Sequence, residues 1–283
     1  MRVGVALPSS IPGTDAPTVL EWARQAEALG FSHLAAIDRI VYGNWDPLLA
    51  LAAAAAVTTR IAVATTVLIS PLRNTELLQK ELATLDQLSG GRLVLGVGIG
   101  ARNDDYQVLE LDTSRRGRVL AEQVGDLRGE GAGAALQPPM VQRDGPVILM
   151  GGGSGAAFAR LARLADGYIH GGGPPRVFAR MADQARTAWI DADRPGAPRL
   201  WGQGYFALSD EGRGRQYIRD YYAFTGPFAD RLAAGILTTP AALLDYVRAY
   251  EEAGCDELSL LPTVGEIGEL ERLAEALETY LTQ

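Results

Sequence analysis

Apolar segments of two kinds alternate along this chain. Short runs rich in Val, Ile and Thr predict strands that are buried on both faces, and longer segments with apolar residues at helical spacing predict helices. The clearest example runs from a strand at Ile61–Ile69 through a helix at Thr75–Leu88 to a strand at Leu93–Val97. Gly98 and Gly100 follow that last strand, so nothing bulky covers its carboxyl end, where parallel sheets bind ligands.

The alternation continues along the whole chain and gives eight strand–helix pairs. The predicted strands are Arg2–Leu7, Leu34–Ile37, Ile61–Ile69, Leu93–Val97, Val147–Met150, Gly167–His170, Leu200–Leu208 and Leu258–Leu261. The predicted helices are Pro17–Leu29, Asp46–Val57, Thr75–Leu88, Ser114–Arg128, Gly155–Leu164, Pro175–Ala192, a broken stretch from Leu208 to Glu252, and Ile267–Tyr280. Eight repeats favour an α/β fold of the (β/α)8 TIM-barrel type over a doubly wound sheet, in a single domain that spans residues 1–283.

Composition limits the partners that we expect. The net charge of −8 argues against nucleic acid and anionic membranes, because both favour a basic face. The chain starts directly with the strand-like RVGVAL, and it contains no run of about 18 apolar residues, so we expect a cytoplasmic protein. Cys255 is the only cysteine, and we expect it to be a small buried side chain. The two histidines do not have the spacing of metal ligands, so no metal site is predicted.

Glycine-rich loops follow two consecutive predicted strands. The run Met150-Gly151-Gly152-Gly153-Ser154 leads directly into a predicted helix, so free backbone N–H groups meet there at a helix N-terminus and a phosphate can bind. Gly171 begins the second glycine run, after the next strand. Tight strand-to-helix turns would explain the same glycines, and this alternative stays open. A dinucleotide fingerprint fits poorly, because no acidic residue ends the following strand.

Polar side chains at the ends of other strands are further candidates. Asp38 ends the second strand, and His170, at the end of the sixth, is the better candidate for proton transfer. His33 precedes a strand, which favours a structural role. Thr65 and Thr66 end the third strand, where β-propensity alone would also explain them.

Another polar run follows the fourth strand. It extends from Arg102 to Tyr106, and a solvated loop is the alternative to a binding role.

Five segments of the chain resemble, in order and spacing, the bacterial-luciferase-like superfamily. They are AEALGFSHLAAID, DPLLALAAAAAVTTRIAVATTVL, LATLDQLSGGRLVLGVGIGARNDDY, PVILMGGGSGAAFARLARLADGYI and TTPAALLDYVRAYEEAGCDELSLLP. The combination of TTRI, a strand, LDxLSGGR and GxG is specific, although each part alone is weak. Members of this superfamily are TIM barrels that act as flavin-dependent monooxygenases or F420-dependent oxidoreductases, and the barrel mouth holds FMN or the deazaflavin F420.

The resemblance implies which residues surround the cofactor. These are Asp38, Thr66, the loop after Gly98 that includes Arg102, the turn at 151–154 and the loop at His170. It also implies a non-prolyl cis peptide between Thr66 and Val67. Of these residues, Asp38 and His170 are the candidates for catalysis. The predicted cofactor-binding residues are Thr65, Thr66, Gly98, Arg102, Met150, Gly151, Gly152, Gly153, Ser154 and Gly171.

Three departures from the family pattern affect the expected chemistry. Arg39 stands where many relatives have a histidine after the acid of the second strand, and the reactive cysteine of the luciferases has no counterpart. The segment between Arg128 and Val147 is shorter and richer in glycine than is usual, so we expect the part that covers substrate to be reduced. These departures leave the acid–base assignment open and do not affect the predicted fold.

Three functions are therefore to be compared. The first is monooxygenation of a small organic substrate with oxygen and reduced FMN that is delivered by a separate flavin reductase. The second is hydride transfer with F420, whose long acidic tail needs cations such as Arg39, Arg102 and Arg176. The third is a flavin-binding barrel without turnover. The lack of an obvious positive cluster favours the first function.

One predicted helix has no polar face. Leu48–Val57 reads LLALAAAAAV, and an apolar strip of this kind on a surface helix is unusual for a monomer. Relatives often pair through helices near this part of the barrel, so we expect a homodimer with a two-fold axis close to this helix. The alternative is that the segment after Leu208 covers the helix within one chain.

Overall fold

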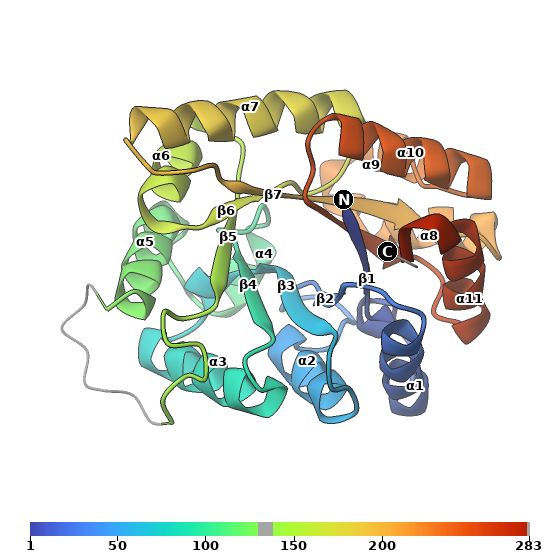
Figure 1. Cartoon of the computed structure of the whole chain (residues 1–283), viewed down its shortest axis with the longest axis horizontal. Coiled ribbons are helices and arrows are strands. Elements are labelled where there is room, and N and C mark those ends of the chain that lie inside the picture. The colour runs from blue at the N-terminus through green and yellow to red at the C-terminus, as the bar shows by residue number, and fades with distance from the viewer. Residues whose placement is uncertain (130–137, 282–283) are drawn as a thin grey trace.

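Eight parallel strands close into a barrel in the order β1 to β8, which confirms the predicted TIM-barrel fold (Figure 1). The computed structural model describes residues 1–129 and 138–281. The strands are β1 (Arg2–Ala6), β2 (His33–Ala36), β3 (Ala62–Leu68), β4 (Leu93–Val97), β5 (Val147–Gly151), β6 (Gly167–Ile169), β7 (Arg199–Phe206) and β8 (Glu257–Pro262). Pairing between β8 and β1 closes the barrel. Residues 130–137, in the segment that was expected to be reduced, lie outside the described residues.

Helices surround the barrel on all sides (Figure 1). The α-helices are α1 (Ala16–Ala28), α2 (Pro47–Ala56), α3 (Thr75–Ser89), α4 (Asp104–Val108), α5 (Arg116–Leu127), α6 (Gly155–Leu164), α7 (Pro175–Asp191), α8 (Glu211–Tyr221), α9 (Phe228–Ala234), α10 (Pro240–Glu252), α11 (Ile267–Ala276) and α12 (Glu278–Leu281). Short 3-10 turns are η1 (Pro8–Ser10), η2 (Ser70–Leu72), η3 (Thr113–Arg115) and η4 (Ala223–Thr225). The breaks expected after Leu208 are present, and they separate α8, α9 and α10.

Side chains along each strand point alternately into the barrel and out toward the helices. Ala64, Leu149, Ile169 and Trp201 form a separate cluster inside the barrel. Their neighbours on the strands, such as Val63 and Met150, belong to the larger core between barrel and helices. A parallel barrel is therefore packed on both strand faces, which explains why the strands are continuous apolar runs.

A buried polar cluster lies at the amino-terminal end of the barrel. Nδ1 of His33 lies 3.0 Å from the Glu257 carboxylate, and Nε2 lies 2.6 Å from the Ser259 hydroxyl. Arg2 forms an ion pair with Glu257. A Cβ atom on Gly4 would lie 2.3 Å from the His33 ring, so this position has room only for glycine. His33 is fully buried with both nitrogens partnered, which fits the predicted structural role.

The turn before β3 is held by one carboxylate. Glu27 accepts hydrogen bonds from the backbone N–H groups of Thr59, Arg60 and Ile61. Burial opposes ionisation of Glu27, but these backbone bonds outweigh it and lower its pKa to about 2. The TTRI motif therefore forms a turn whose backbone N–H groups donate hydrogen bonds to the Glu27 carboxylate.

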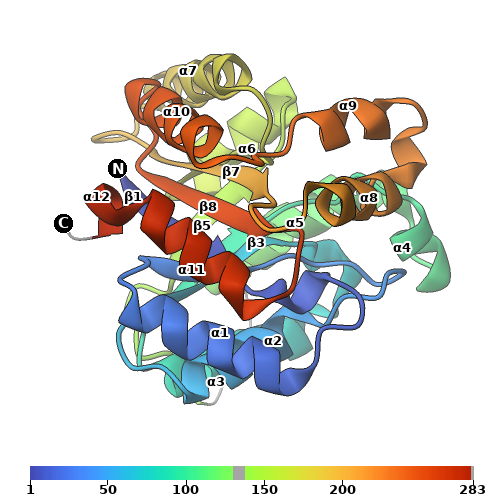
Figure 2. The ribbon, with the colours of Figure 1, turned by 90° about the vertical axis from the view of Figure 1, so that its right-hand side faces the viewer.

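The apolar helix α2 keeps one face uncovered. It packs against α1, α3, β2 and β3, and Leu49 on its outer side is 73% exposed. On the neighbouring α3, Leu77 and Leu88 are also exposed. Helices α8 and α9 lie with α4 at one end of the barrel, away from α2 (Figure 2). The alternative that the segment after Leu208 covers this helix is therefore wrong.

Two smaller findings concern single features of the sequence. Cys255 is buried just before β8, as predicted, and burial with the nearby Asp256 charge raises its pKa well above the ordinary value. Among residues 1–129 and 138–281, the structure has no helix with the length and apolar character needed to cross a bilayer.

Candidate active site

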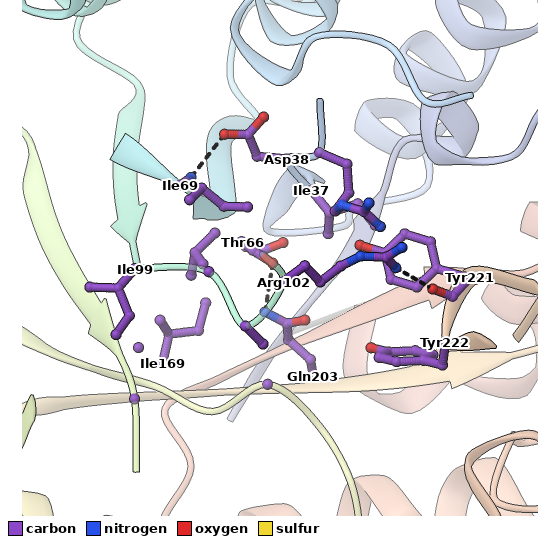
Figure 3. Close-up of a pocket in the computed structure, with 18 of the residues that line it drawn as sticks. Ile37, Asp38, Thr66, Ile69, Ile99, Arg102, Ile169, Gln203, Tyr221 and Tyr222 are labelled. Carbon is purple, nitrogen blue, oxygen red and sulfur yellow. Dashed lines mark hydrogen bonds between the residues drawn. The ribbon is translucent and has the colours of Figure 1, made fainter. Parts of the chain in front are cut away.

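A cavity of about 510 Å³ opens at the carboxyl ends of the strands, where TIM barrels place their active sites (Figure 3). Residues from six of the strands, β2 to β7, or from the segments that follow them line it. The lining consists of Ile37, Asp38, Arg39, Thr66, Val67, Ile69, Gly98, Ile99, Gly100, Ala101, Arg102, Arg116, Gly151, Gly152, Ile169, Gly171, Gln203, Tyr205, Tyr221, Tyr222 and Phe224. The size is within the range of pockets that bury a small organic ligand.

The polypeptide bends into the cavity at the end of β3. The peptide bond between Thr66 and Val67 is cis, as the family resemblance implied, and the register of β3 with β4 shifts here. The Gln203 side chain donates a 2.9 Å hydrogen bond to the carbonyl oxygen of Thr66 (Figure 3). The hydroxyl of Thr66 is buried in the cavity lining and has no partner among the described residues. This hydroxyl is available to a ligand.

Asp38 lies in the cavity lining, but its carboxylate is occupied. It accepts a 2.8 Å hydrogen bond from the Ile69 backbone N–H (Figure 3) and forms an ion pair with Arg73. The side chain of Asp38 is fully buried. A carboxylate held in this way fixes the end of β3, and its contacts indicate positioning rather than proton transfer.

The glycine loops divide into residues that reach the cavity and residues that do not. Gly151, Gly152 and Gly171 line the cavity, whereas Gly153 and Ser154 lie outside its lining. Gly152 has φ +142°, and a Cβ atom there would lie 2.6 Å from Cβ of Ala157 on α6. The backbone at Gly152 therefore packs so closely against α6 that this position has no room for a side chain. Ser154 caps α6 by accepting a hydrogen bond from the Ala157 N–H.

Three predicted site residues are outside the cavity lining. Thr65 donates to the carbonyl oxygen of Gly96, and Met150 is fully buried in the outer core. His170 lies behind Gly171, with Nδ1 3.0 Å from the Tyr168 hydroxyl and the ring against Phe178. The strand alternation is the reason, since Thr66, Gly151 and Ile169 beside them take the inward positions. Burial lowers the pKa of His170, although the Gly172 backbone offsets part of this effect.

The polar run after β4 is a folded part of the site rather than a solvated loop. It contains α4, and its Asp105 is fully buried. Asp105 accepts hydrogen bonds from the backbone N–H groups of Ile40 and Val41 and forms an ion pair with Arg39 at 2.7 Å. Asp104 forms ion pairs with both Arg39 and Arg102.

Arg102 is held on three sides. It donates a 2.8 Å hydrogen bond to the Tyr221 carbonyl oxygen (Figure 3), pairs with Asp104, and lies 4.3 Å from the centre of the Phe224 ring. Hydrogen bonding and the charge of Arg102 in turn lower the pKa of Asp104. Arg39 and Arg102 are therefore both neutralised within the protein. Arg176, the third candidate for an acidic tail, is exposed and lies outside the cavity lining.

Sequence reasoning missed Arg116, the first residue of α5. It lines the cavity, and its Nη1 atom is buried without a partner among the described residues. Its charge lies 6.0 Å from the centre of the Tyr106 ring. A search of strand ends cannot find this residue, because it lies on a helix 19 residues after Val97.

Sequence reasoning also missed the aromatic side of the cavity. Tyr205 comes from β7, Tyr221 and Tyr222 from the end of α8, and Phe224 from η4. The Tyr205 hydroxyl lies 3.0 Å from the Tyr222 hydroxyl. Gln203 and Tyr205 are two residues apart on β7, so strand alternation places their side chains on the same face. This spacing is the only signal that the sequence offers for the aromatic residues.

The described residues contain no group of three or more His, Cys, Asp or Glu side chains placed to hold a metal ion.

Comparison with known proteins agrees with the barrel fold. Residues 1–234 match the family model of the luciferase-like monooxygenases. An uncharacterised protein of Mycobacterium tuberculosis strain H37Rv is 31% identical over 215 residues, which are 64% of this chain and 74% of that protein. Another uncharacterised protein, from Mycobacterium bovis, is 36% identical over 172 residues, which are 55% of this chain and 60% of that protein.

Solved structures of low sequence identity share the fold. The monooxygenase RslO1 from Streptomyces bottropensis is 21% identical with a TM-score of 0.76 and covers 99% of both chains. An F420-dependent secondary alcohol dehydrogenase, solved with an F420–acetone adduct, is 14% identical with a TM-score of 0.77, over 99% of this chain and 98% of its own. The FMN-bound oxygenating component of 3,6-diketocamphane monooxygenase from Pseudomonas putida is 16% identical with a TM-score of 0.70, over 98% and 96%. Since the family model covers most of its length, the chain belongs to the luciferase-like monooxygenase family.

Proposed function

We propose that this protein is a monooxygenase that uses reduced FMN and oxygen on a small organic substrate. The observation that supports FMN most directly is the charge of the cavity. Asp104 and Asp105 neutralise Arg39 and Arg102, and Arg73 neutralises Asp38. Of the lining cations that the structure describes, this leaves Arg116 without a partner. One cation fits the single phosphate of FMN better than the long acidic tail of F420.

The residues present fit an FMN phosphate at one part of the cavity. Gly152 lines the cavity without a side chain, and α6 begins three residues later. Helices α5 and α6 pack against each other, which brings Arg116 to the same side of the barrel. In the proposed complex Gly152 and Arg116 hold the phosphate.

The rest of the lining orients and shields the reaction. When bound, reduced FMN supplies the electrons that activate oxygen. Val67, Ile99 and Ile169 give this part of the cavity apolar walls that exclude water. The free Thr66 hydroxyl is a hydrogen-bonding group for the cofactor ring, and Asp38 fixes the backbone at Ile69 beside it. A separate flavin reductase would supply the reduced cofactor.

Fluorescence titration of the apoprotein with FMN, riboflavin and F420 tests this assignment. We expect FMN to bind most tightly, and Arg116→Gln to weaken FMN about 10- to 100-fold while riboflavin, which lacks the phosphate, is unaffected. Arg118→Gln on the same helix is the matched control, because Arg118 is exposed and pairs with Glu122. Tighter binding of F420 than of FMN would instead support hydride transfer.

Turnover is tested separately. Oxidation of reduced FMN is followed with and without organic substrates under air. Product that carries an oxygen atom from O2 supports the monooxygenase. A protein that binds FMN and oxidises no substrate from a broad panel would instead be the non-catalytic barrel.

We also propose that the protein is a homodimer through α2. Leu49 on this helix is 73% exposed, and Leu77 and Leu88 on α3 extend the apolar surface. Light scattering should give twice the chain mass of 30.1 kDa, and Leu49→Arg should shift the protein toward monomer. Ile190→Arg is the control, because Ile190 is 72% exposed on α7, on the opposite side of the barrel (Figure 1). A dimer indifferent to Leu49→Arg would place the interface elsewhere.

A further inference from the structure

Four aromatic side chains form one side of the cavity. Tyr205, Tyr221, Tyr222 and Phe224 all belong to its lining. Figure 3 shows Tyr221 and Tyr222 opposite Ile99 and Ile169, on the far side of the cavity. The rings of Tyr222 and Phe224 are nearly parallel, with an interplanar angle of 29° and centroids 6.2 Å apart. Tyr221 meets Tyr222 edge-on at 76°. This arrangement offers both flat faces and ring edges to a planar ligand.

The phenol pair has one proton more than its contacts use. Tyr205 and Tyr222 carry two hydroxyl protons, and the 3.0 Å bond between the hydroxyls uses one of them. Neither hydroxyl has another partner among the described residues. Burial raises the pKa of both tyrosines, so both stay protonated at neutral pH. One hydroxyl therefore has a proton to donate, and both residues line the cavity.

The charges near these aromatic residues cancel. Arg39 and Arg102 are the closest lining cations, and Asp104 and Asp105 neutralise them. An anionic ligand would have to compete with those carboxylates, and a cationic ligand would meet two guanidinium groups. The surroundings therefore favour a neutral ligand.

We propose that this side of the cavity binds the substrate as a neutral aromatic ketone, whose carbonyl oxygen accepts a hydrogen bond from the Tyr205–Tyr222 pair. A carbonyl satisfies the spare donor without adding a proton that needs its own acceptor. The rings of Tyr222 and Phe224 then pack against the aromatic part. The inference rests on the proposed function only in placing the substrate beside the cofactor.

Matched ligands test this assignment by calorimetry, with and without oxidised FMN. Tetralone has a fused aromatic ring and one ketone, tetralin lacks the ketone, and naphthoate carries a negative charge. We expect tetralone to bind more tightly than the other two. Tyr222→Phe and Tyr205→Phe should each weaken tetralone about five- to tenfold and leave tetralin unchanged, since only the ketone uses the hydroxyl. Tyr280→Phe is the control, because its hydroxyl bonds to Glu251 and both residues are outside the cavity lining.

Three outcomes would overturn the assignment: no tetralone binding, equal loss of tetralone and tetralin in the phenylalanine variants, or tighter binding of naphthoate. FMN titration of the same variants separates this result from the proposed function. If FMN does not bind but the tetralone pattern is as expected, the recognition site stands and the FMN assignment fails. If FMN binds normally and tetralone does not, only the recognition site is wrong.

Discussion

The two ends of the barrel differ in whether their buried polar groups have hydrogen-bond partners. At the amino-terminal end, both nitrogens of His33 have partners, and Glu257 bonds to Ser32, His33 and Arg2. At the carboxyl end, the Thr66 hydroxyl, Nη1 of Arg116 and Nε2 of His170 are buried without partners among the described residues. An unpaired buried polar group costs stability. The unpaired groups lower stability at the end where ligands bind, whereas the hydrogen-bonded groups at the amino-terminal end stabilise the fold.

The largest expected effect is at the amino-terminal end. Glu257→Ala should lower the free energy of unfolding by about 3–5 kcal/mol, because it leaves His33 and Arg2 without their buried partner. Chemical denaturation measures this change. FMN affinity, titrated where the variant is folded, should stay within about twofold of the wild type. A large loss of FMN affinity in the folded variant would break the division between the two ends.

The next effect is at the ligand end. Gly152→Asp should weaken FMN at least about 100-fold, because the new side chain clashes with Ala157 in the proposed phosphate-binding turn and adds a negative charge there. Fluorescence titration measures the affinity. Gly153→Ala is the control, because only the Met181 sulfur, at 3.9 Å, would lie near the added carbon. A folded Gly152→Asp variant that binds FMN normally would show that the phosphate binds elsewhere.

A substitution of His170 tests the difference between the two ends more sharply, because His170 lies at the carboxyl end of the barrel but faces away from the cavity. We expect His170→Gln to keep turnover within about tenfold of the wild type and to retain the pH profile. Were His170 the base, its neutral form would be needed, and the wild-type rate would fall as the pH drops through a pKa below 6.5. Loss of that acid limb in His170→Gln, with a much larger decrease in rate, would restore the catalytic assignment.

The smallest effect returns to the amino-terminal end. Glu27 has a pKa lowered to about 2 from 4.5, so its contribution to stability is present above pH 4.5 and is lost as the pH falls toward 2. Because Glu27 is only partly buried, we expect only about 1 kcal/mol. Glu27→Gln should remove this part of the acid dependence, as measured by urea denaturation between pH 2 and pH 7. An unchanged dependence would mean that other carboxylates account for it.

The sequence predicts the fold well because strand and helix periods alternate without interruption. The eight strands have their predicted order, and their ends differ by at most two residues. The short helix α4 was missed, because Asp104 and Asp105 make its first turn look like a solvated loop. Only the fold shows that Asp105 is buried against the backbone at Ile40.

The site is predicted less completely, for two physical reasons. Thr65 and Thr66 are adjacent and chemically alike, and only the inward register of β3 shows that Thr66 alone lines the cavity. Arg116 lies on a helix and Tyr222 directly follows one, so a rule based on strand ends does not select them. The glycines at 151 and 152 were predicted because a run of glycines in the sequence indicates close approach to the backbone.

The bond from Asp105 to the chain at Ile40 and Val41 has a consequence for engineering. Asp105 binds their backbone N–H groups, so the loop keeps these bonds with any residue other than proline at the two positions. Both side chains are exposed near the cavity mouth, at 39% and 43%. Libraries randomised at these two positions can therefore alter what enters the site while the scaffold stays intact, and any new selectivity would be obtained at little risk to folding.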